Sequence, residues 1–429
     1  GEQLPTHRAL AEAVGVSIQT VSFAYAHAEK EGHVHGKVGS GTFVSHRSSE
    51  PVEFLQDKVV DPTAVIDLSI ACAVAGSRQE LAYKKSLLAM SQRPASLQLI
   101  NAVKPFAGLL AHRQAAARWL QGLGVEAAVE QICICNGATH ALLIAISGLL
   151  KPGSVIACEA LVDHGLISLA RTLNFKLEGI AMDHQGMIPE AFEQSCRQKS
   201  VAALCITPSM HKPTTATLPD ERRQAIASIA EKYQIPVVED DVFAPLATER
   251  KRPISSYIPE LSYYISSLTK SVASGLRVGY LLPPKSEVHQ VIGRLRASSW
   301  MASPLTVEVA SDWIFQGTAD ALLDWQRQQL VKRQQLAAKI LQGQQFSADS
   351  QGPLIWLQLP ENWRADAFIA QARTRGVSIT AAEPFVVGHQ PAPHAVRVSV
   401  ASAASIDELQ QGLQILADLL GDTPMPSFS

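Results

Sequence analysis

The sequence predicts an α/β protein in which a domain with a mostly parallel β-sheet follows a small helical head. After residue 95, short apolar runs typical of strands alternate with helical patterns, as in a parallel sheet with helices on its faces. Within residues 1–47, two helical patterns are joined by a short turn, which is typical of a helix-turn-helix. The expected strands are QICIC, SVIACE, FKLEGIAM, VAALCIT, IPVVED, YYISSL and RVGYLLP.

The composition is that of a large globular protein with reduced thiols. The chain has 429 residues, of which 47% are hydrophobic and 18% charged, and this suggests about three folding units. The net charge of -2 gives no argument for nucleic acid or an acidic membrane as a partner. None of the six cysteines forms a C-x-x-C pair, and most lie in apolar runs, as in cytosolic proteins.

No secretion signal opens the sequence. The longest uncharged run, residues 131–150, is interrupted by Asn136, Gly137 and His140, so strand, turn and helix explain it better than a membrane span. We therefore expect a cytoplasmic protein with no membrane contact. Because the chain begins at Gly1, already inside a motif, we also expect part of the natural N-terminus to precede it.

The head is expected to contain two helices and a hairpin. Thr6 is a suitable N-cap for the first helix and Gly15 a suitable stop, while Ser17 caps the second helix. The following stretch, HVHGKVGSGTFVS, predicts a hairpin with a glycine-rich tip, which is the wing of a winged helix.

DNA binding is one interpretation of this head, and an ordinary helical hairpin is the other. Charge does not decide between them, because residues 1–47 contain four Lys or Arg and four Glu. If the head binds DNA, the start of the second helix faces the major groove, and basic side chains and backbone amides hold the phosphates. The residues are Ser17, Gln19 and Thr20 for the groove, and Arg8, Lys37, Gly39, Ser40 and Gly41 for the phosphates.

Four polar features of the larger domain fall at or near the ends of expected strands, where such sheets bind ligands. After QICIC, the turn Asn136-Gly137-Ala138-Thr139 opens a helix whose free amides attract an anion such as phosphate. After IPVV come the acidic residues Glu239, Asp240 and Asp241, which form a helix cap or a solvated loop, or bind a metal or a cationic ligand nitrogen. A metal site there lacks convincing histidine or cysteine companions.

The third feature is the stretch SSLTKSVASGLRVGYLLPP. A desolvated Lys270 has a lowered pKa and suits a Schiff base with a carbonyl, whereas a lone lysine in a mobile loop is the plain alternative. Arg277 and the hydroxyls of Ser267 and Thr269 suit a phosphate. The S-x-x-K match to serine acyl transferases is rejected because S-D-N and K-T-G are absent, and no glycine loop precedes the lysine as in a P-loop.

The fourth feature is Arg397 in the strand HAVRVSVA, which either binds a substrate carboxylate or faces solvent. Together the four features match pyridoxal 5'-phosphate, a cofactor with an aldehyde, a phosphate and a basic ring nitrogen. Lys270 would form the Schiff base, Asp240 would keep the ring nitrogen protonated, and Arg397 would hold the carboxylate of an amino acid. The phosphate-holding residues would be Gly137, Ala138, Thr139, Ser267, Thr269 and Arg277.

Both halves of the chain resemble known families. LPTHRALAEAVGVSIQTVSFAYAHAEKEG, followed by GSGTFV, resembles the GntR-type winged-helix regulators. Residues from about Asp67 onward resemble fold-type I aminotransferases of class I/II. There, SSLTKSVASGLRVGYLLPP resembles S-F-S-K-x-x-x-P-G-L-R-x-G-Y, VVEDDVF resembles E-D-D-x-Y, and ITPSMHKPTTATLPDERR resembles T-P-S-H-Q-x-P-T-G-x-T-x-x-x-x-R-R. A GntR-type head on such a body is the architecture of MocR-type regulators.

The resemblance implies a winged helix-turn-helix followed by a pyridoxal-phosphate-dependent transferase fold of type I. That fold has a large, mostly parallel sheet domain and a small α+β C-terminal domain, and its pockets form at the interface of a homodimer. The polar, proline-broken stretch SHRSSEPVEFLQDKVVDPT lies between head and body. The expected bounds are 1–46 for the head, 47–66 for the linker and 67–424 for the body, divided into about 95–310 and 311–424.

Several pocket positions depart from the family pattern. Asp163 stands where a tyrosine stacks on the cofactor ring, although His164 could stack instead. Phe243 replaces the tyrosine of E-D-D-x-Y and lacks the hydroxyl that bonds the cofactor's phenolic oxygen. Val103 replaces the tyrosine that a partner subunit lends to the phosphate, and Thr215 replaces the glycine of P-T-G. We expect cofactor binding to be retained and transamination to be weak or lost.

The sequence thus predicts a homodimeric regulator that binds an operator in double-stranded DNA. Its effector would be an amine, an amino acid or pyridoxal phosphate, which exchanges at Lys270 and shifts the protein between two states. One alternative is a working aminotransferase that converts amino acids to 2-oxo acids and carries a vestigial head. Ile18, which replaces a family arginine, favours that alternative, and the pocket substitutions oppose it. The other is a DNA-binding protein whose body is only a dimerisation scaffold.

Overall fold

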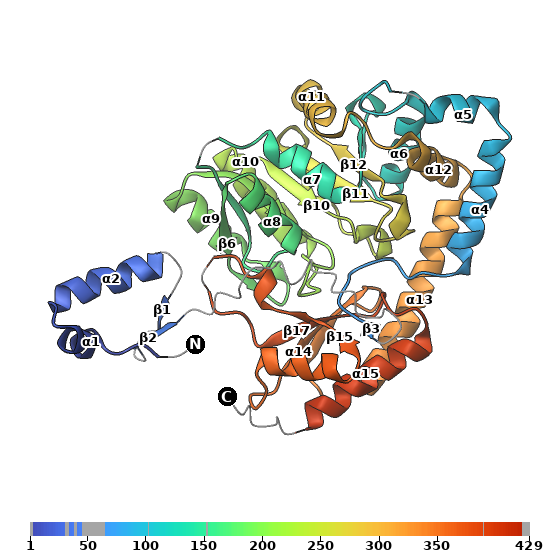
Figure 1. The fold of residues 1–429 in the computed structure, drawn as a ribbon. Coiled ribbons are helices and arrows are strands. Elements are labelled where there is room, and N and C mark those ends of the chain that lie inside the picture. The colour runs from blue at the N-terminus through green and yellow to red at the C-terminus, as the bar shows by residue number, and fades with distance from the viewer. Residues whose placement is uncertain are drawn as a thin grey trace. The chain divides into compact units, whose positions relative to one another are not determined.

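The structure is a computed structural model that describes residues 3–30, 34–37, 41–44, 65–101, 103–151, 153–388 and 390–422. The chain divides into two compact units, which are considered separately (Figure 1). The first lies within Gly1–Pro62 and also includes His389–Ala392, and the second comprises Thr63–Gly388 and Pro393–Ser429.

The first unit contains the expected pair of helices and a hairpin. Helix α1 (His7–Val14) is capped by the Thr6 hydroxyl, which accepts a hydrogen bond from the Ala9 amide at 3.3 Å, and it ends at Gly15 with φ 73°. Helix α2 (Ile18–Lys30) follows after a short turn, and β1 (Val34–Lys37) pairs antiparallel with β2 (Gly41–Val44). The small core consists of buried Ala11, Val21 and Tyr25. The predicted helix-turn-helix and hairpin are therefore confirmed.

The second unit is built on a seven-stranded sheet of order β4-β12-β11-β10-β9-β5-β6 (Figure 1). All neighbouring pairs are parallel except those of β12, which is antiparallel to both β11 and β4. Each of the seven apolar runs forms one of these strands, so the prediction of a mostly parallel sheet is confirmed. The strands are β4 (Cys133–Cys135), β5 (Val155–Glu159), β6 (Lys176–Ile180), β9 (Val201–Ile206), β10 (Val237–Asp240), β11 (Ser262–Ser267) and β12 (Gly279–Leu282).

Successive side chains of a strand point to opposite faces of the sheet, so the apolar strands make both faces apolar. Helices cover each face. Val238 of β10 packs in one apolar cluster with residues of α7, α8 and α11, whereas Val237 packs in another with residues of α9 and α10. The helices are α7 (Ala138–Ser147), α8 (His164–Thr172), α9 (Pro189–Gln198), α10 (Asp220–Tyr233) and α11 (Val288–Ser299).

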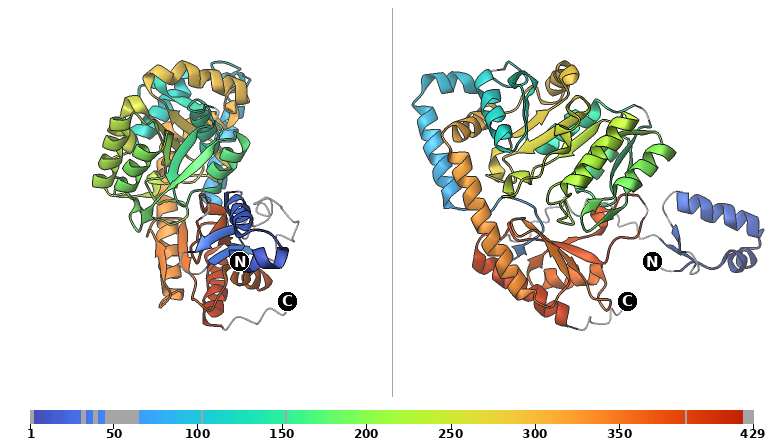
Figure 2. Two further views of the ribbon diagram at one scale, coloured as in Figure 1. Left: turned by 90° about the vertical axis from the view of Figure 1, so that its left-hand side faces the viewer. Right: turned by 180° about the vertical axis from the view of Figure 1, so that it is seen from behind.

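A second, antiparallel sheet has the strand order β13-β14-β17-β16. The long helix α13 (Thr318–Ile340) passes from the large sheet toward this smaller part (Figure 2). Ile66, the last residue of the expected linker, lies in β3 (Ile66–Asp67), which pairs in parallel with β15 (Val377–Ser378). The other elements of this part are β13 (Phe346–Ala348), β14 (Leu354–Gln358), α14 (Ala365–Thr374), β16 (Thr380–Ala381), β17 (Ala395–Ser399) and α15 (Ile406–Gly421).

Four further helices gather at one end of the large sheet, where α12 contacts α4, α5 and α6 (Figure 1). In the part of the chain that the structure describes, no single helix is long and apolar enough to span a membrane, and α1 and α2 reach that length only as a pair bent by 115°. The remaining elements are α4 (Ser77–Ser91), α5 (Pro94–Ile100), α6 (Leu110–Gly122), α12 (Pro304–Phe315), β7 (Met182–Asp183) and β8 (Gly186–Met187).

Candidate functional site

Polar residues converge at one edge of the large sheet. Strands β4, β5, β9, β10 and β11 run in the same direction, since β4 and β11 are both antiparallel to β12. The carboxyl ends of parallel strands meet at a common edge, where α/β proteins bind ligands. The residues at or just after these ends are Gly137 (β4), Asp163 (β5), Lys212 (β9), Asp240 (β10) and Lys270 (β11).

Gly137 and Arg277 lie against each other at the start of α7. Gly137 has φ 81°, and a Cβ added to it would lie 3.0 Å from Nη2 of Arg277. A Cβ on Gly279 would lie 2.6 Å from the carbonyl carbon of Gly137, so the backbones also approach closely. The amides of Ala138 and Thr139 belong to the first turn of α7, which leaves them without intrahelical acceptors. A guanidinium beside these amides forms a cradle suited to an anion.

Ser267 and Thr269 fix the turn that leads to Lys270. The buried Ser267 hydroxyl lies 2.8 Å from the Val278 carbonyl oxygen and accepts a hydrogen bond from the Thr269 amide at 3.0 Å. Oγ1 of Thr269 lies 2.9 Å from the same hydroxyl. These bonds hold the loop between β11 and β12 in shape. The contact of either hydroxyl with a phosphate stays a prediction.

Lys270 is largely buried, and its ammonium group donates a hydrogen bond to the Ala71 carbonyl. Burial lowers the pKa of Lys270, and repulsion from the Lys212 cation lowers it further, against the attraction of Asp163. A lysine that loses its proton more readily than usual is a better nucleophile toward a carbonyl carbon.

Asp240 offers one free oxygen. It is 9% exposed, and its Oδ2 accepts a hydrogen bond from Nζ of Lys212 at 2.7 Å. Its Oδ1 is buried and has no hydrogen-bond partner among the described residues. Because an unpaired buried acceptor costs free energy, it marks a place where a ligand N–H can bind.

Lys212 is the pocket residue that sequence reasoning missed. Its side chain is 6% exposed, and its Nζ lies 4.0 Å from Oδ2 of Asp163 in addition to the bond with Asp240. Burial alone would lower the pKa of Lys212, but the two carboxylates outweigh burial and raise it. The residue falls on the variable position of T-P-S-H-Q-x-P-T-G, so the only available signal was a lysine just after a buried strand.

Asp163 and His164 begin α8. The Asp163 carboxylate caps the helix by accepting from the Gly165 amide at 2.9 Å. Burial would raise the pKa of Asp163, but Lys212 and His164 outweigh burial and hold this pKa well below its usual range. The ring of His164 lies 6.5 Å from that of Phe385, centroid to centroid, and burial lowers its pKa.

The other substituted positions differ in burial. Phe243 is fully buried, and Nζ of Lys212 lies 5.9 Å from its ring centroid. Thr215 is buried with φ 66°, a conformation that favours glycine, so this substitution carries backbone strain. Val103 is 62% exposed.

Arg397 does not face solvent, so that interpretation of its strand is wrong. The side chain is 2% exposed, and Nη2 donates to the Ser69 carbonyl and, at 3.3 Å, to Oγ1 of Thr380. Its guanidinium carbon lies 4.7 Å from the Phe385 ring centroid, and burial lowers its pKa to about 10. Nε is buried without a hydrogen-bond partner in the described part of the chain.

In the head, the expected DNA-facing residues of α2 are exposed. Ser17 caps the helix, accepting from the Thr20 amide at 3.1 Å, and its Oγ lies 2.8 Å from Oγ1 of Thr20. Arg8 and Gln19 are exposed as well, as is Ile18 with 49% of its surface accessible. The backbone of Lys37 lies in β1 and Gly41 begins β2 with φ 108°, while Gly39, Ser40 and the Lys37 side chain lie outside the described residues.

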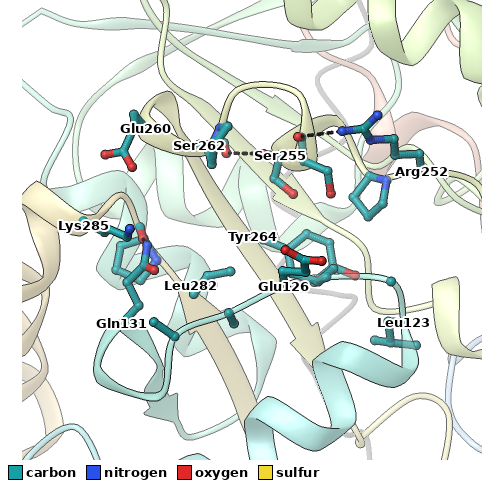
Figure 3. A pocket seen from close by; sticks show the side chains of 18 of the residues that line it. Leu123, Glu126, Gln131, Arg252, Ser255, Glu260, Ser262, Tyr264, Leu282 and Lys285 are labelled. Carbon is teal, nitrogen blue, oxygen red and sulfur yellow. Dashed lines mark hydrogen bonds between the residues drawn. The ribbon is translucent and has the colours of Figure 1, made fainter.

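A separate cavity of about 870 Å³ opens at the amino end of β11, away from Lys270 (Figure 3). Some of its polar groups bond each other: the Ser262 hydroxyl lies 3.4 Å from the Ser255 carbonyl, and Arg252 donates to the Ser256 carbonyl at 3.2 Å. None of the predicted site residues lines it.

Two protein families match the chain. The family "Aminotransferase class I and II" matches residues 77–416, and "Bacterial regulatory proteins, gntR family" matches residues 1–44. The "Uncharacterized HTH-type transcriptional regulator YdeF" of Bacillus subtilis is 30% identical over 98% of this chain and 90% of its own length. The "Vitamin B6 salvage pathway transcriptional repressor PtsJ" of Salmonella typhimurium is 28% identical, over 59% of each chain.

Two solved aminotransferase structures share the fold of this chain. An archaeal alanine:glyoxylate aminotransferase superposes with a TM-score of 0.78 at 21% identity, covering 86% of this chain and 93% of its own. LysN, the alpha-aminoadipate aminotransferase of Thermus thermophilus, gives 0.77 at 18% identity, covering 87% and 95%. The fold is therefore that of a type I transferase, with a GntR helix-turn-helix before it. This chain belongs to the MocR-type transcriptional regulators, in which a GntR head precedes a class I and II aminotransferase domain.

Proposed function

We propose that the second unit binds pyridoxal 5'-phosphate at Lys270 and that an amine, an amino acid or the cofactor itself changes how the head binds an operator in double-stranded DNA. The free Oδ1 of Asp240 is the observation that carries this proposal. A buried carboxylate oxygen without a donor is costly, and a protonated ring nitrogen is the donor that it lacks.

The residues present fit the three functional groups of this cofactor. The neutral amine of Lys270 would attack the aldehyde, the amides of α7 with Arg277 would hold the phosphate, and Asp240 would keep a proton on the ring nitrogen. When bound, the cofactor supplies an electron sink for chemistry at the α-carbon of an amine. Arg397 would hold the carboxylate of an amino acid, with Nε still available as a donor.

The head would bind DNA as other GntR-type regulators do. The start of α2, with Ser17, Gln19 and Thr20, would enter the major groove, while Arg8 and the amides of the hairpin would contact phosphates. Because Ile18 replaces a basic residue, fewer direct contacts are available than in other heads of this type. Because the head is nearly neutral and makes few such contacts, its affinity for DNA would fall only slowly as the salt concentration rises.

A homodimer would bring two such heads to one operator. Large apolar side chains are exposed on and between α4, α5, α6 and α12, which is unusual for a monomer surface. The Trp300 indole donates to the Val103 carbonyl at 3.0 Å and joins the loops into the same surface. We call this surface the apolar patch; it consists of Leu81, Leu87, Leu88, Leu97, Val103, Leu110, Trp300, Leu305 and Phe315.

An active aminotransferase is the second candidate, favoured by the partly buried Lys270 and by the buried Asp240 and Arg397. Phe243, which lacks a hydroxyl, and the carboxylate of Asp163 in place of an aromatic ring oppose it. Weak or absent conversion of amino acids to 2-oxo acids by the purified cytoplasmic protein is what we expect. Efficient turnover would favour the enzyme instead.

Operator binding by the full-length protein tests the proposal. We expect the wild type loaded with pyridoxal phosphate to absorb visible light and to change its DNA affinity when candidate amines are added. Lys270→Ala should lose the visible absorbance and the response together, because the amine that forms the Schiff base is gone. A colourless wild type would refute cofactor binding, and an unchanged DNA affinity in all conditions would refute effector sensing.

A further inference from the structure

A second lysine, Lys212, is buried near Lys270, and two carboxylates offset its positive charge. Lys212, in the loop after β9, donates to Oδ2 of Asp240 at 2.7 Å and lies 4.0 Å from Oδ2 of Asp163. Its side chain is 6% exposed and the Asp240 side chain 13%. An ammonium group at this depth requires such partners, so the pairing is a built feature of the pocket rather than a surface ion pair.

Lys212 leaves one oxygen of Asp240 unused. The charge-assisted hydrogen bond from Lys212 to Oδ2 offsets the cost of burying the Asp240 carboxylate. Oδ1 meanwhile has no hydrogen-bond partner among the described residues. Asp240 thus has one oxygen bonded to Lys212 and one oxygen available to accept a hydrogen bond from a protonated ring nitrogen.

Lys212 also acts on Lys270. Its cation disfavours a second positive charge in the same pocket and adds to the effect of burial on the Lys270 amine. The other charged or titratable groups facing these two lysines are Asp163, Asp240, Cys72, Cys205 and Arg277. Further titratable or charged groups of the described residues interact with Asp163, Asp240 or Lys212; they are Glu159, His164, His211 and Arg397.

We infer that Lys212 is a positioning residue of the cofactor pocket: it binds one oxygen of Asp240 and leaves the other for the ring nitrogen of pyridoxal phosphate, and its cation disfavours a positive charge on the Lys270 amine that attacks the aldehyde. The inference rests on the proposed binding of this cofactor. A neutral side chain at position 212 removes both effects, whereas an arginine keeps the charge.

The rate at which Lys270 takes up pyridoxal phosphate, measured against pH, tests this role. In that reaction the amine nitrogen bonds to the aldehyde carbon, and the aldehyde oxygen leaves as water with both amine protons. We expect Lys212→Met to shift the midpoint of the rate profile upward by about one pH unit and to slow uptake about tenfold at neutral pH. Lys212→Arg should stay close to the wild type. Lys232→Met, at an exposed lysine on α10, is the matched control and should change nothing.

The outcomes separate this inference from the proposed function. A wild type that never gains visible absorbance refutes cofactor binding itself. A wild type that binds through Lys270, with an unchanged midpoint in Lys212→Met, overturns the role of Lys212 and leaves cofactor binding standing. If Lys212→Met does not fold by circular dichroism, Lys212→Met with Asp240→Asn removes both charges of the pair. An upward shift in that folded double variant supports the inference, and an unchanged midpoint overturns it.

Discussion

Lys270 and Lys212 lie at the same edge of the large sheet, yet their pKa values shift in opposite directions. Burial acts on both, but Lys212 bonds a carboxylate and lies near a second one, whereas the hydrogen-bond partner of Lys270 is a neutral carbonyl, that of Ala71. One lysine is therefore held as a cation and the other is brought toward the neutral form. The opposite shifts arise from the partners, since the two side chains are chemically identical.

Asp163 permits a test of a single charge at this scale. Its carboxylate caps α8 and lies near Lys212, and its pKa is lowered from an ordinary value of 3.8 because Lys212 and His164 outweigh burial. Asp163→Asn keeps a good cap and removes only the charge. We expect a loss of about 1 kcal/mol in the free energy of unfolding at neutral pH, limited by partial exposure of the side chain.

The pH dependence of this effect has a definite sign. A lowered folded-state pKa stabilises the protein above the ordinary value and loses that contribution as pH falls toward the folded-state value. The difference between the wild type and Asp163→Asn should thus shrink below about pH 4. Urea unfolding followed by tryptophan fluorescence at several pH values measures it. A difference that is independent of pH would contradict the role of the charge.

At the scale of elements, strands were predictable and their side-chain contacts were not. All seven apolar runs of the large sheet became strands, because buried parallel strands are continuous hydrophobic stretches. The pairing of Lys212 with Asp240 joins the loop after β9 to the last residue of β10, 28 residues away in the chain, and no local pattern reports such a contact. The burial of Arg397 likewise depends on Ser69, 328 residues earlier in the chain.

The start of α7 offers a test of how one element shapes the candidate phosphate site. A Cβ at Gly137 would crowd Nη2 of Arg277 at 3.0 Å, so Gly137→Ala should displace the guanidinium from the anion cradle. We expect the affinity for pyridoxal phosphate to fall about tenfold, the value of one charge-assisted hydrogen bond, while binding of pyridoxal, which lacks the phosphate, changes little. Equilibrium titration by absorbance compares the two ligands.

Gly153 supplies the matched control for this substitution. It also has a positive φ, 78°, but a Cβ there would meet nothing within 4 Å. Gly153→Ala therefore places a Cβ at a positive φ without touching the cradle. Equal losses of cofactor affinity in the two variants would show that strain, and not crowding of Arg277, is the cause.

At the scale of the whole molecule, the proposed homodimer would let two heads act on one operator. A winged helix that reads one half-site gains affinity when a second copy reads the other, because the second contact becomes intramolecular. The sequence could predict a dimer only through the resemblance to aminotransferases. The structure adds the apolar patch on α4, α5, α6 and α12, whose exposed leucines no periodicity in the sequence separates from core leucines.

Disruption of the apolar patch should uncouple the units without unfolding either. Leu88 is 58% exposed, so Leu88→Glu costs little in a monomer but buries a charge in a symmetric interface, where it occurs twice. We expect the dimer dissociation constant, measured by analytical ultracentrifugation, to rise at least about 100-fold, and operator affinity to fall with it.

Ile406→Glu, at a 43% exposed residue that starts α15 outside the patch, is the matched control. A Leu88→Glu protein that remains dimeric at the same concentration would place the interface elsewhere. Loss of DNA binding in a protein that is still dimeric would show that the patch acts on the head by another route.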